Sequence, residues 1–368
     1  LKIYPGAGCT SASSSLFCSM YDTAILIGRF EPVHTGHVAL LREALSRAQR
    51  AIVVVGSAHQ PRSPRNPFTW QEREAMLRGA LPGHDGKSLT VLPVRDYYNE
   101  AIWVDAVREA IARHTAPQER RGLVGHFKDT TSSYLDAVPG WELIRMERQG
   151  GIDATAIRDA YFSATPATLS AALGVLAADI PPATYALLER FAQTPSFAAL
   201  QEEWRALRDG RAAWAGAPYP PTFVTVDALL RARDQVLLIR RGHSPGKGLL
   251  ALPGGFIDVH ETLLQSCLRE LAEETHCALP ASALTAVLRE VRVFAHPARS
   301  QRGRTITHVH HFDLGEQLPP EVRADDDAAL AQWLPIADLA ALEDQFFDDH
   351  FHILDSFLGL LARPTRTS

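Results

Sequence analysis

The chain has 368 residues, of which 46% are hydrophobic and 21% charged, a composition ordinary for a soluble globular protein. Its length suits about two or three average domains. The net charge of −5 argues against a dedicated nucleic-acid-binding protein, and no apolar run approaches the roughly twenty residues that a membrane span needs. The four cysteines form no Cys-x-x-Cys pair, which fits a reducing, cytoplasmic location.

Residues 1–20 are rich in Ser, Gly and Ala, without the basic start or the apolar stretch of a signal peptide. They end at Met20, directly before the first apolar run. We predict that they are an extension that is disordered or not native, with Met20 as the natural start.

The next part of the chain alternates apolar runs with amphipathic segments. The runs predict strands near 24–28, 51–56, 89–94 and 122–126, separated by helices near 37–48, 70–80 and 100–113. This alternation makes a parallel sheet with helices on both faces. We therefore predict an α/β fold, with a doubly wound, Rossmann-like domain over residues 21–165.

Two histidines follow the first predicted strand, in the sequence GRFEPVHTGH at 28–37. The strand breaks at Gly28 and a helical pattern begins at Val38, so His34 and His37 lie at a helix N-terminus. Imidazoles there can donate hydrogen bonds to a triphosphate and stabilise charge on a transferred phosphoryl group. A structural role for both histidines is the alternative.

The motif resembles that of the nucleotidyltransferase superfamily, and later segments are similar to archaeal-type nicotinamide mononucleotide adenylyltransferases. These segments are NPFTWQER (66–73), DYYNEAIWV (96–104), GHFKD (125–129) and GIDATAIR (151–158). The resemblance covers about residues 22–165. It implies catalytic roles for His34, His37 and Arg158, and an ATP site made of Gly28, Arg29, Phe30, His34, His37, Thr155 and Arg158.

One residue departs from this pattern, because Asp153 stands where the family usually has Ser. We expect its carboxylate to cap the following helix rather than to face a phosphate.

The same resemblance places four residues around the nicotinamide nucleotide: Asn66, Phe68, Asn99 and Trp103. A pyridinium ring is a flat cation and an indole face is its best cation–π partner, so we assign ring stacking to Trp103. The alternative is that Trp103 is a core residue of an amphipathic helix.

Residues 166–216 are Ala-rich and helical in pattern, with prolines as breaks, and predict a helical appendage and linker. The sequence PYPP at 218–221 marks the entry to a second domain over residues 217–368. Paired strands are predicted at 223–226 and 235–240, and helices near 261–275 and 345–361.

Four glutamates are crowded near the first of these helices. Glu270 and Glu274 share a helix face, with Glu273 beside them and Glu261 ahead. Such carboxylates repel one another unless a cation lies among them, and their hard oxygens suit Mg²⁺ or Mn²⁺. A solvated acidic helix face is the alternative.

Together with Gly255 and Arg269, these glutamates resemble the Nudix box of a family of diphosphate hydrolases. The resemblance implies an α/β/α sandwich and metal ligation by Glu261, Glu270, Glu273 and Glu274, the last three of them catalytic. The chain departs from the box at His276, which replaces a Gly, and at Cys277. Residue 276 is expected near the helix C-terminus, where a left-handed backbone is common.

Three arginines precede a predicted strand at 305–312. The segment resembles a stretch in ADP-ribose-binding Nudix proteins, which implies that Arg299, Arg302 and Arg304 clamp a pyrophosphate or a ribose. His308, His310 and His311 raise the question of zinc. Strand alternation, which puts His308 and His310 on one sheet face, and the absence of a nearby cysteine in the sequence argue against it.

These resemblances imply a bifunctional enzyme that uses Mg²⁺ or Mn²⁺ in both domains. The first domain would join ATP and nicotinamide mononucleotide into NAD, and the second would hydrolyse ADP-ribose. No nucleic acid or membrane is expected as a partner, and self-association into a homo-oligomer stays open. The alternatives are another nucleotidyltransferase specificity, or a non-catalytic second domain that senses ADP-ribose or NAD.

Overall fold

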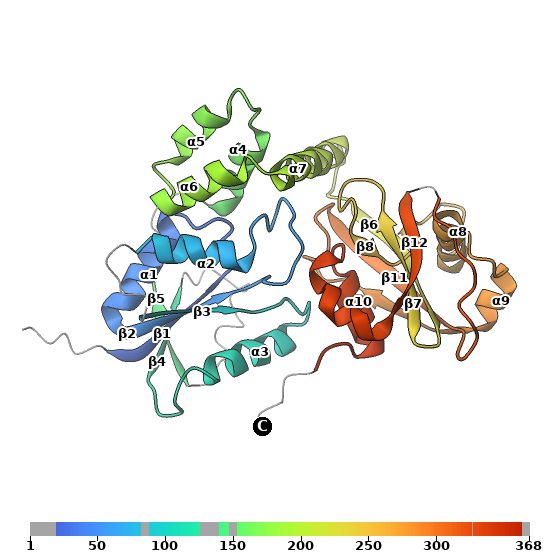
Figure 1. Ribbon diagram of the computed structural model, residues 1–368, viewed down its shortest axis with the longest axis horizontal. Helices are drawn as coiled ribbons and strands as arrows, with labels where there is room; N and C mark the ends of the chain where they lie inside the picture. Colours follow the sequence, from blue (N-terminus) through green and yellow to red (C-terminus); the bar gives the residue numbers. More distant parts are fainter. Residues whose placement is uncertain (1–19, 82–87, 126–139, 147–152, 326, 363–368) are drawn as a thin grey trace, which may run out of the picture.

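The computed structural model describes residues 20–81, 88–125, 140–146, 153–325 and 327–362 (Figure 1). Within these ranges the chain forms two sheets, each covered by helices on both faces. No helix of the described ranges has both the length and the apolar character required to cross a membrane.

The first sheet has five parallel strands in the order β3-β2-β1-β4-β5. The strands are β1 (Tyr21–Gly28), β2 (Ala48–Val55), β3 (Leu89–Pro93), β4 (Arg121–Gly125) and β5 (Trp141–Arg145). The predicted parallel, doubly wound sheet is therefore confirmed. The strand order reverses between β1 and β4, and ligands of such sheets bind at the carboxyl ends of the strands near the reversal.

Alternation along β1 separates two cores. Ala24 and Leu26 pack with α1 (Thr35–Arg47), α2 (Trp70–Gly79) and α4 (Ala154–Ser163), whereas Ile25 packs with α3 (Glu100–Ala112) on the opposite face. Because the helices pack against β1 from both sides, the end of the strand at Gly28 is held in a fixed position.

Three further helices continue the core of the first domain: α5 (Leu169–Leu176), α6 (Pro182–Phe191) and α7 (Pro195–Ala213). Tyr161 donates a hydrogen bond to Leu188 O at 2.6 Å, and Trp204 Nε1 donates to Asp159 Oδ1 at 2.9 Å. The predicted helical segment thus packs on the first sheet domain rather than standing apart from it.

The second sheet has the path β10-β11-β6-β7-β12, with β8 paired to β7 and β9 to β6. Its strands are β6 (Thr222–Ala232), β7 (Gln235–Arg241), β8 (Leu250–Ala251), β9 (Gly254–Phe256), β10 (Leu288–Phe294), β11 (Arg304–Asp313) and β12 (Ala328–Pro335). One face packs on α8 (Leu263–Thr275) and α9 (Ala281–Ala286), and the other on η3 (Ile336–Gln345) and α10 (His350–Leu358). This confirms the predicted sandwich.

The C-terminal helix is shorter than the predicted 345–361, because it starts only at His350. Asp348 adopts a left-handed backbone at φ 46°, which an α-helix does not accommodate. The chain therefore turns between η3 and α10, and this turn faces the first domain.

His350 is expected to make the folded protein less stable at acidic pH. Its side chain is 6% exposed, and its Nδ1 accepts the Leu252 N–H at 3.0 Å. Burial lowers its pKa to about 4, with nearby arginines adding to this and Asp227 opposing it. An unfolded histidine titrates near about 6.5. Between these values the unfolded chain binds a proton that the folded chain excludes, so stability falls as the pH drops through this window.

His350→Asn keeps an acceptor for Leu252 but does not titrate. We expect a smaller loss of unfolding free energy between pH 7 and pH 5 than in wild type, measured by urea denaturation. An equal loss in both proteins would contradict the assignment, and His243→Asn, at an exposed histidine, serves as the control.

Candidate functional site

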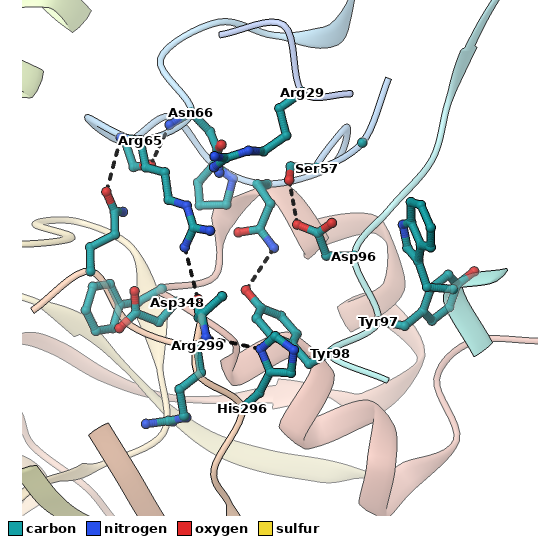
Figure 2. A pocket seen from close by; sticks show the side chains of 18 of the residues that line it. Arg29, Ser57, Arg65, Asn66, Asp96, Tyr97, Tyr98, His296, Arg299 and Asp348 are labelled. Atoms are coloured by element: carbon teal, nitrogen blue, oxygen red, sulfur yellow. Dashed lines mark hydrogen bonds between the residues drawn. The ribbon is translucent and has the colours of Figure 1, made fainter. Parts of the chain in front are cut away.

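A cavity of about 490 Å³ lies between the two sheets, at the carboxyl ends of β1 and β2 (Figure 2). Gly28 ends β1, while Gly56 and Ser57 directly follow β2. The opposite wall comes from the second domain, through Leu249, His296, Ala298, Arg299, Gln301, Phe347 and Asp348. The cavity is thus where parallel sheets of this type bind ligands, and the second domain covers it.

Two polar atoms in the cavity wall are buried without a partner in the described part of the chain, Arg29 Nη1 and Asn66 Oδ1. A buried donor or acceptor left unpaired costs about 1–3 kcal/mol. Burial lowers the pKa of Arg29 to about 10, and the positive charges of Arg65 and Arg158 lower it further. A ligand with an anionic group and a hydrogen-bond donor would relieve all of these costs.

Asn99 and Trp103 lie in the same cavity and one helical turn apart on α3. Asn99 begins the helix by accepting the Ile102 N–H at 3.1 Å, and Trp103 packs partly on the core beneath. Of the four residues predicted around the nicotinamide nucleotide, three therefore line one cavity: Asn66, Asn99 and Trp103.

Phe68, the fourth, does not line the cavity. Its side chain is 3% exposed and packs edge-on against Phe191 at 5.2 Å. Its amide N–H donates to Glu31 at 3.1 Å, so Phe68 contributes through its backbone and the core.

His34 is the N-cap of α1 and His37 lies in its first turn, so both are at the helix N-terminus, with their rings 3.8 Å apart. His34 Nδ1 accepts the Gly36 N–H at 3.2 Å, and His37 Nδ1 accepts the His34 N–H at 3.3 Å. Because both Nδ1 atoms accept, each neutral ring carries its proton on Nε2. The two imidazoles are therefore set as N–H donors at a helix N-terminus, the arrangement that binds anions.

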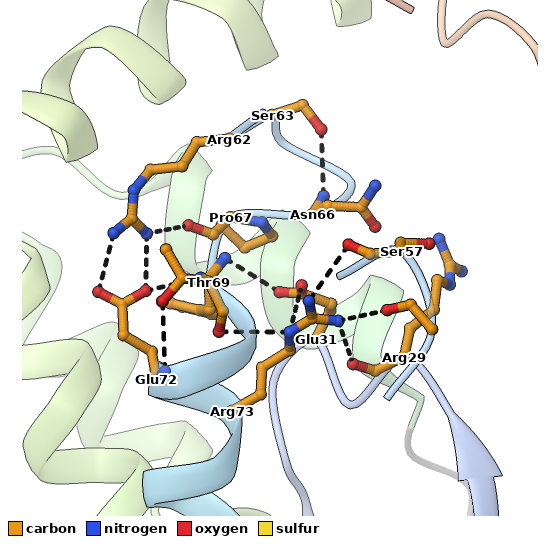
Figure 3. A network of polar contacts seen from close by, with 12 residues as sticks. Arg29, Glu31, Ser57, Arg62, Ser63, Asn66, Pro67, Thr69, Glu72 and Arg73 are labelled. Atoms are coloured by element: carbon orange, nitrogen blue, oxygen red, sulfur yellow. Dashed lines mark hydrogen bonds and ion pairs between the residues drawn. The ribbon is translucent and has the colours of Figure 1, made fainter. Parts of the chain in front are cut away.

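A buried ion pair between Arg73 and Glu31 supports the loops that follow β1 and β2 (Figure 3). Arg73 and Glu31 are each 1% exposed, and Arg73 Nε lies 3.1 Å from Glu31 Oε1. Arg73 also donates to the carbonyl oxygens of Arg29, Gly56 and Ser57 at 2.8–3.2 Å. Burial raises the pKa of Glu31, an effect that Arg73 opposes. One side chain thus fixes both loops that end β1 and β2.

In the segment GIDATAIR (151–158), Asp153 caps α4 by accepting the Ala156 N–H at 2.9 Å, as expected. Arg158 is 8% exposed and donates to Glu31 O at 2.6 Å and to Thr155 Oγ1 at 3.3 Å. Arg158 and Thr155 are not among the residues that line the cavity, nor are Phe30, His34 and His37.

Several cavity residues were missed by the sequence reasoning. Ser57 donates to Asp96 at 2.6 Å, and Gln60 donates to the Tyr98 hydroxyl at 3.3 Å. Their positions directly after β2 and β3 were a signal for Ser57 and Asp96, because ligands bind at those strand ends. Ser57 and Tyr98 also have left-handed backbones, at φ 51° and 49°, and such strain gathers at functional sites.

The glutamates of the second domain lie around Arg269. Its guanidinium contacts Glu261 at 3.0 Å, Glu270 at 2.8 Å and Glu273 at 2.8 Å. In the described ranges, no three His, Cys, Asp or Glu side chains are grouped to hold a metal ion. The carboxylates do share one side of α8, with the arginine in the place of a cation.

Glu274 is separate from this arrangement. It is 4% exposed, accepts the Gly254 N–H at 2.8 Å, and burial raises its pKa to about 8. Position 255 requires glycine, because a Cβ there would lie 2.5 Å from Glu270 Oε2. The loop and helix of the box therefore fit against each other through Gly255 and Glu270.

His276, the departure from the box, ends α8 with a left-handed backbone at φ 42°, as expected for that position. Its Nε2 lies 2.6 Å from Asp325 Oδ2. This side-chain contact stabilises a conformation that glycine would adopt more easily.

The three arginines predicted to clamp ADP-ribose do not form one clamp. Arg299 is 3% exposed and forms a bidentate pair with Asp349 at 2.8 and 2.9 Å. Arg302 lies over the rings of Phe256 and Phe347, and Arg304 donates to Ala295 O at 2.7 Å. Each guanidinium therefore has its own acceptor or ring.

Part of the predicted site falls outside the described residues. This applies to positions 126–129 and 151–152 of the later motifs, and to residues 1–19 of the predicted extension.

Comparisons with known proteins identify the two halves. Residues 25–160 match the Cytidylyltransferase-like family, and residues 221–357 match the NUDIX domain. Over 187 residues the chain is 29% identical to the nicotinamide/nicotinic acid mononucleotide adenylyltransferase of Acinetobacter baylyi, covering 50% of this chain and 95% of that protein. It is 32% identical to the ADP-ribose pyrophosphatase of Methanocaldococcus jannaschii, covering 37% of this chain and 72% of that protein. Fold and sites thus define a nucleotidyltransferase joined to a Nudix hydrolase.

The whole architecture also has a solved counterpart. A bifunctional NMN adenylyltransferase/ADP ribose pyrophosphatase from Francisella tularensis superposes with a TM-score of 0.85 at 32% identity, covering 92% of this chain and 99% of that one. A second structure of that kind from the same organism, with AMP and a Mn ion, gives 0.84 at 31% identity, with the same coverage of both chains. The chain belongs to the family of bifunctional NMN adenylyltransferase/ADP-ribose pyrophosphatases.

Proposed function

We propose that the first domain transfers the adenylyl group of ATP to nicotinamide mononucleotide, which yields NAD and pyrophosphate. We propose that the second domain hydrolyses ADP-ribose to AMP and ribose 5-phosphate. The observation that carries the first activity is the cavity, where the unpartnered Arg29 Nη1 and Asn66 Oδ1 lie with Asn99 and Trp103. The carboxylates around Arg269 carry the second.

In the transferase reaction, a phosphate oxygen of the mononucleotide attacks the α-phosphorus of ATP in line, and pyrophosphate leaves. Such reactions need positioning and charge stabilisation more than covalent chemistry. The Nε2–H groups of His34 and His37 donate to the polyphosphate, and Thr155, which contacts Arg158, also contributes to its binding. Arg29 and Arg158 carry fixed positive charge close to it.

Stacking in the cavity selects the mononucleotide. The Trp103 face binds the pyridinium ring, while Asn66 Oδ1 accepts from a donor group of the substrate. Arg29 faces its phosphate. Nicotinic acid mononucleotide carries a carboxylate in place of the carboxamide, so it offers Asn66 no N–H donor there.

In the hydrolase reaction, Glu261, Glu270, Glu273 and Glu274 would hold Mg²⁺ or Mn²⁺, for which carboxylate oxygens are suitable ligands. The metal would supply charge neutralisation at the pyrophosphate and an activated water. Arg269 has to release carboxylates when a divalent cation enters, and it then lies beside the site as a positive group. We also propose that a divalent cation accompanies ATP in the first domain.

The wild-type protein, incubated with ATP, nicotinamide mononucleotide and Mg²⁺, is expected to form NAD and pyrophosphate. With ADP-ribose and Mg²⁺ it is expected to form AMP. Chromatography of the products tests both activities, and a panel of mononucleotides and diphosphates distinguishes other specificities. A second domain that binds ADP-ribose without ever releasing AMP would be a sensor instead.

Trp103→Ala is expected to raise the KM for nicotinamide mononucleotide about 5- to 30-fold, because it removes a contact of about 1–2 kcal/mol. The KM for ATP should stay within about twofold. Trp141→Ala removes a second partly buried tryptophan from the same core without touching the cavity, and serves as the control. Equal rises of both KM values in Trp103→Ala would contradict nicotinamide stacking.

A further inference from the structure

The second domain forms one wall of the cavity that holds the proposed mononucleotide site. Most of that wall comes from the loop between β10 and β11, which we call the β10–β11 loop and define as residues 295–303. His296, Ala298, Arg299 and Gln301 of this loop line the cavity. The loop therefore faces residues of the first domain that lie far from it in sequence.

Arg65 of the first domain is bonded to this loop at two points. Its amide N–H donates to Gln301 Oε1 at 3.1 Å, and its Nη1 donates to Ala298 O at 3.2 Å (Figure 2). Arg65 directly precedes Asn66, which carries the unpartnered Oδ1, and its charge reaches Arg29. The loop thus fixes both the backbone and the guanidinium of a cavity arginine.

The second domain also docks on the other side of the cavity. Tyr98 contacts the edges of His296 and His352 at ring distances of 5.4 and 5.2 Å. Arg95 pairs with Glu343 at 3.1 Å, where the carboxylate side chain is 10% exposed. Since Tyr98 is next to Asn99, both edges of the proposed mononucleotide site contact the second domain.

Hydrogen bonding within the loop determines what it can offer a ligand. His296 Nδ1 accepts the Ala298 N–H at 3.2 Å, so its neutral ring carries the proton on Nε2. Gln301 Oε1 is engaged by Arg65, which leaves the amide N–H groups of Gln301 as its donors. The bidentate pair of Arg299 with Asp349 holds the loop between these two residues. The loop therefore presents N–H donors, which suit the phosphate and ribose oxygens of a mononucleotide.

We propose that the β10–β11 loop of the Nudix domain completes the mononucleotide site of the nucleotidyltransferase domain. Gln301 is a positioning residue that holds Arg65 toward the substrate phosphate, and His296 donates its Nε2–H to the mononucleotide. This inference rests on the proposed adenylyl transfer. It assigns to the second domain a part in a reaction that its own Nudix site does not perform.

The test compares Gln301→Ala and His296→Ala with wild type in the full-length chain. For both variants we expect the KM for nicotinamide mononucleotide to rise about 10- to 30-fold, which corresponds to the loss of about one hydrogen bond to a charged group. The KM for ATP and the kcat should change less than about threefold. His296→Gln keeps an N–H donor and should recover part of the loss.

Two internal controls accompany these variants. Release of AMP from ADP-ribose, measured on the same samples, shows whether the second domain is folded and active. Gln317→Ala makes the same change at an exposed glutamine of that domain, away from the cavity, and should leave every KM unchanged.

Different outcomes would overturn the proposed role of the β10–β11 loop and the proposed adenylyl transfer. An unchanged mononucleotide KM in both alanine variants would overturn the inference, as would a selective loss of ADP-ribose hydrolysis, which would assign the loop to the Nudix site. A wild type that makes no NAD would refute the proposed transfer itself. Calorimetric titration with nicotinamide mononucleotide then still tests the loop, because Gln301→Ala should weaken binding and an unaltered Kd would reject it.

Discussion

Replacing Glu273 by Gln is expected to lower the kcat for ADP-ribose hydrolysis about 100- to 1000-fold and to leave NAD synthesis unchanged. Glu273 is one of three carboxylates around Arg269 and is accessible to an entering cation, with 44% of its side chain exposed. A neutral amide binds a hard divalent cation weakly, and losing several kcal/mol of charge stabilisation has this effect on rate. Measured AMP release at saturating Mg²⁺ tests the prediction, with retained ADP-ribose binding as evidence of an intact site.

Glu316→Gln provides the matched control, since this glutamate is exposed on the loop after β11 and lies outside the carboxylate group. Its hydrolysis rate should equal that of wild type. Hydrolysis within about tenfold of wild type in Glu273→Gln would remove this residue from the metal site. A parallel loss of NAD synthesis would show that the substitution disturbs the whole protein.

Replacing Arg73 by Met is expected to destabilise the first domain by about 3–5 kcal/mol, because it leaves Glu31 buried without its ion-pair partner. The change also removes donors from the carbonyl oxygens of Arg29, Gly56 and Ser57. NAD synthesis should fall with stability, since these loops form the cavity wall. Thermal unfolding followed by scanning calorimetry measures the effect, and ADP-ribose hydrolysis reports on the second domain separately.

A matched control lies on the same helix. Arg78 pairs with Glu74 at the surface, and its side chain is 40% exposed. Arg78→Met should cost less than about 1 kcal/mol, as exposed ion pairs do. The double variant Glu31→Gln with Arg73→Met should be more stable than the sum of the two single changes predicts, because neither charge is left alone. Strict additivity would contradict a coupled buried pair.

Much of the fold was predictable, because it depends on local patterns. Apolar runs and helical periodicity predicted most elements of the first domain, and β7, α8 and β11 of the second, to within a few residues. The strand predicted at 223–226 extends to Ala232 as β6, and no range was predicted for β5, β8, β9, β10 and β12. The alternation of elements also predicted the parallel first sheet correctly. The C-terminal helix was predicted too long, since the turn at Asp348 carries no Gly or Pro as a signal.

The parts of the site that are made by residues close together in the sequence were also predictable. Helix caps by His34, Asp153 and the left-handed His276 follow from residues within a few positions, so the sequence is sufficient to predict them. The placement of Glu270 and Glu273 beside Arg269 likewise follows from their spacing along α8, whereas the burial of Glu274 against Gly254 does not.

By itself, then, the sequence determined the two sheet domains, their helix ends and the carboxylate face. Only the tertiary structure decided which distant groups meet, because hydrogen bonding between remote residues depends on how the domains dock and has no characteristic spacing. Arg65 and Gln301 bond across 236 positions, and Arg299 is paired with Asp349 rather than held out toward a ligand. The cavity shared by both domains arises from this docking.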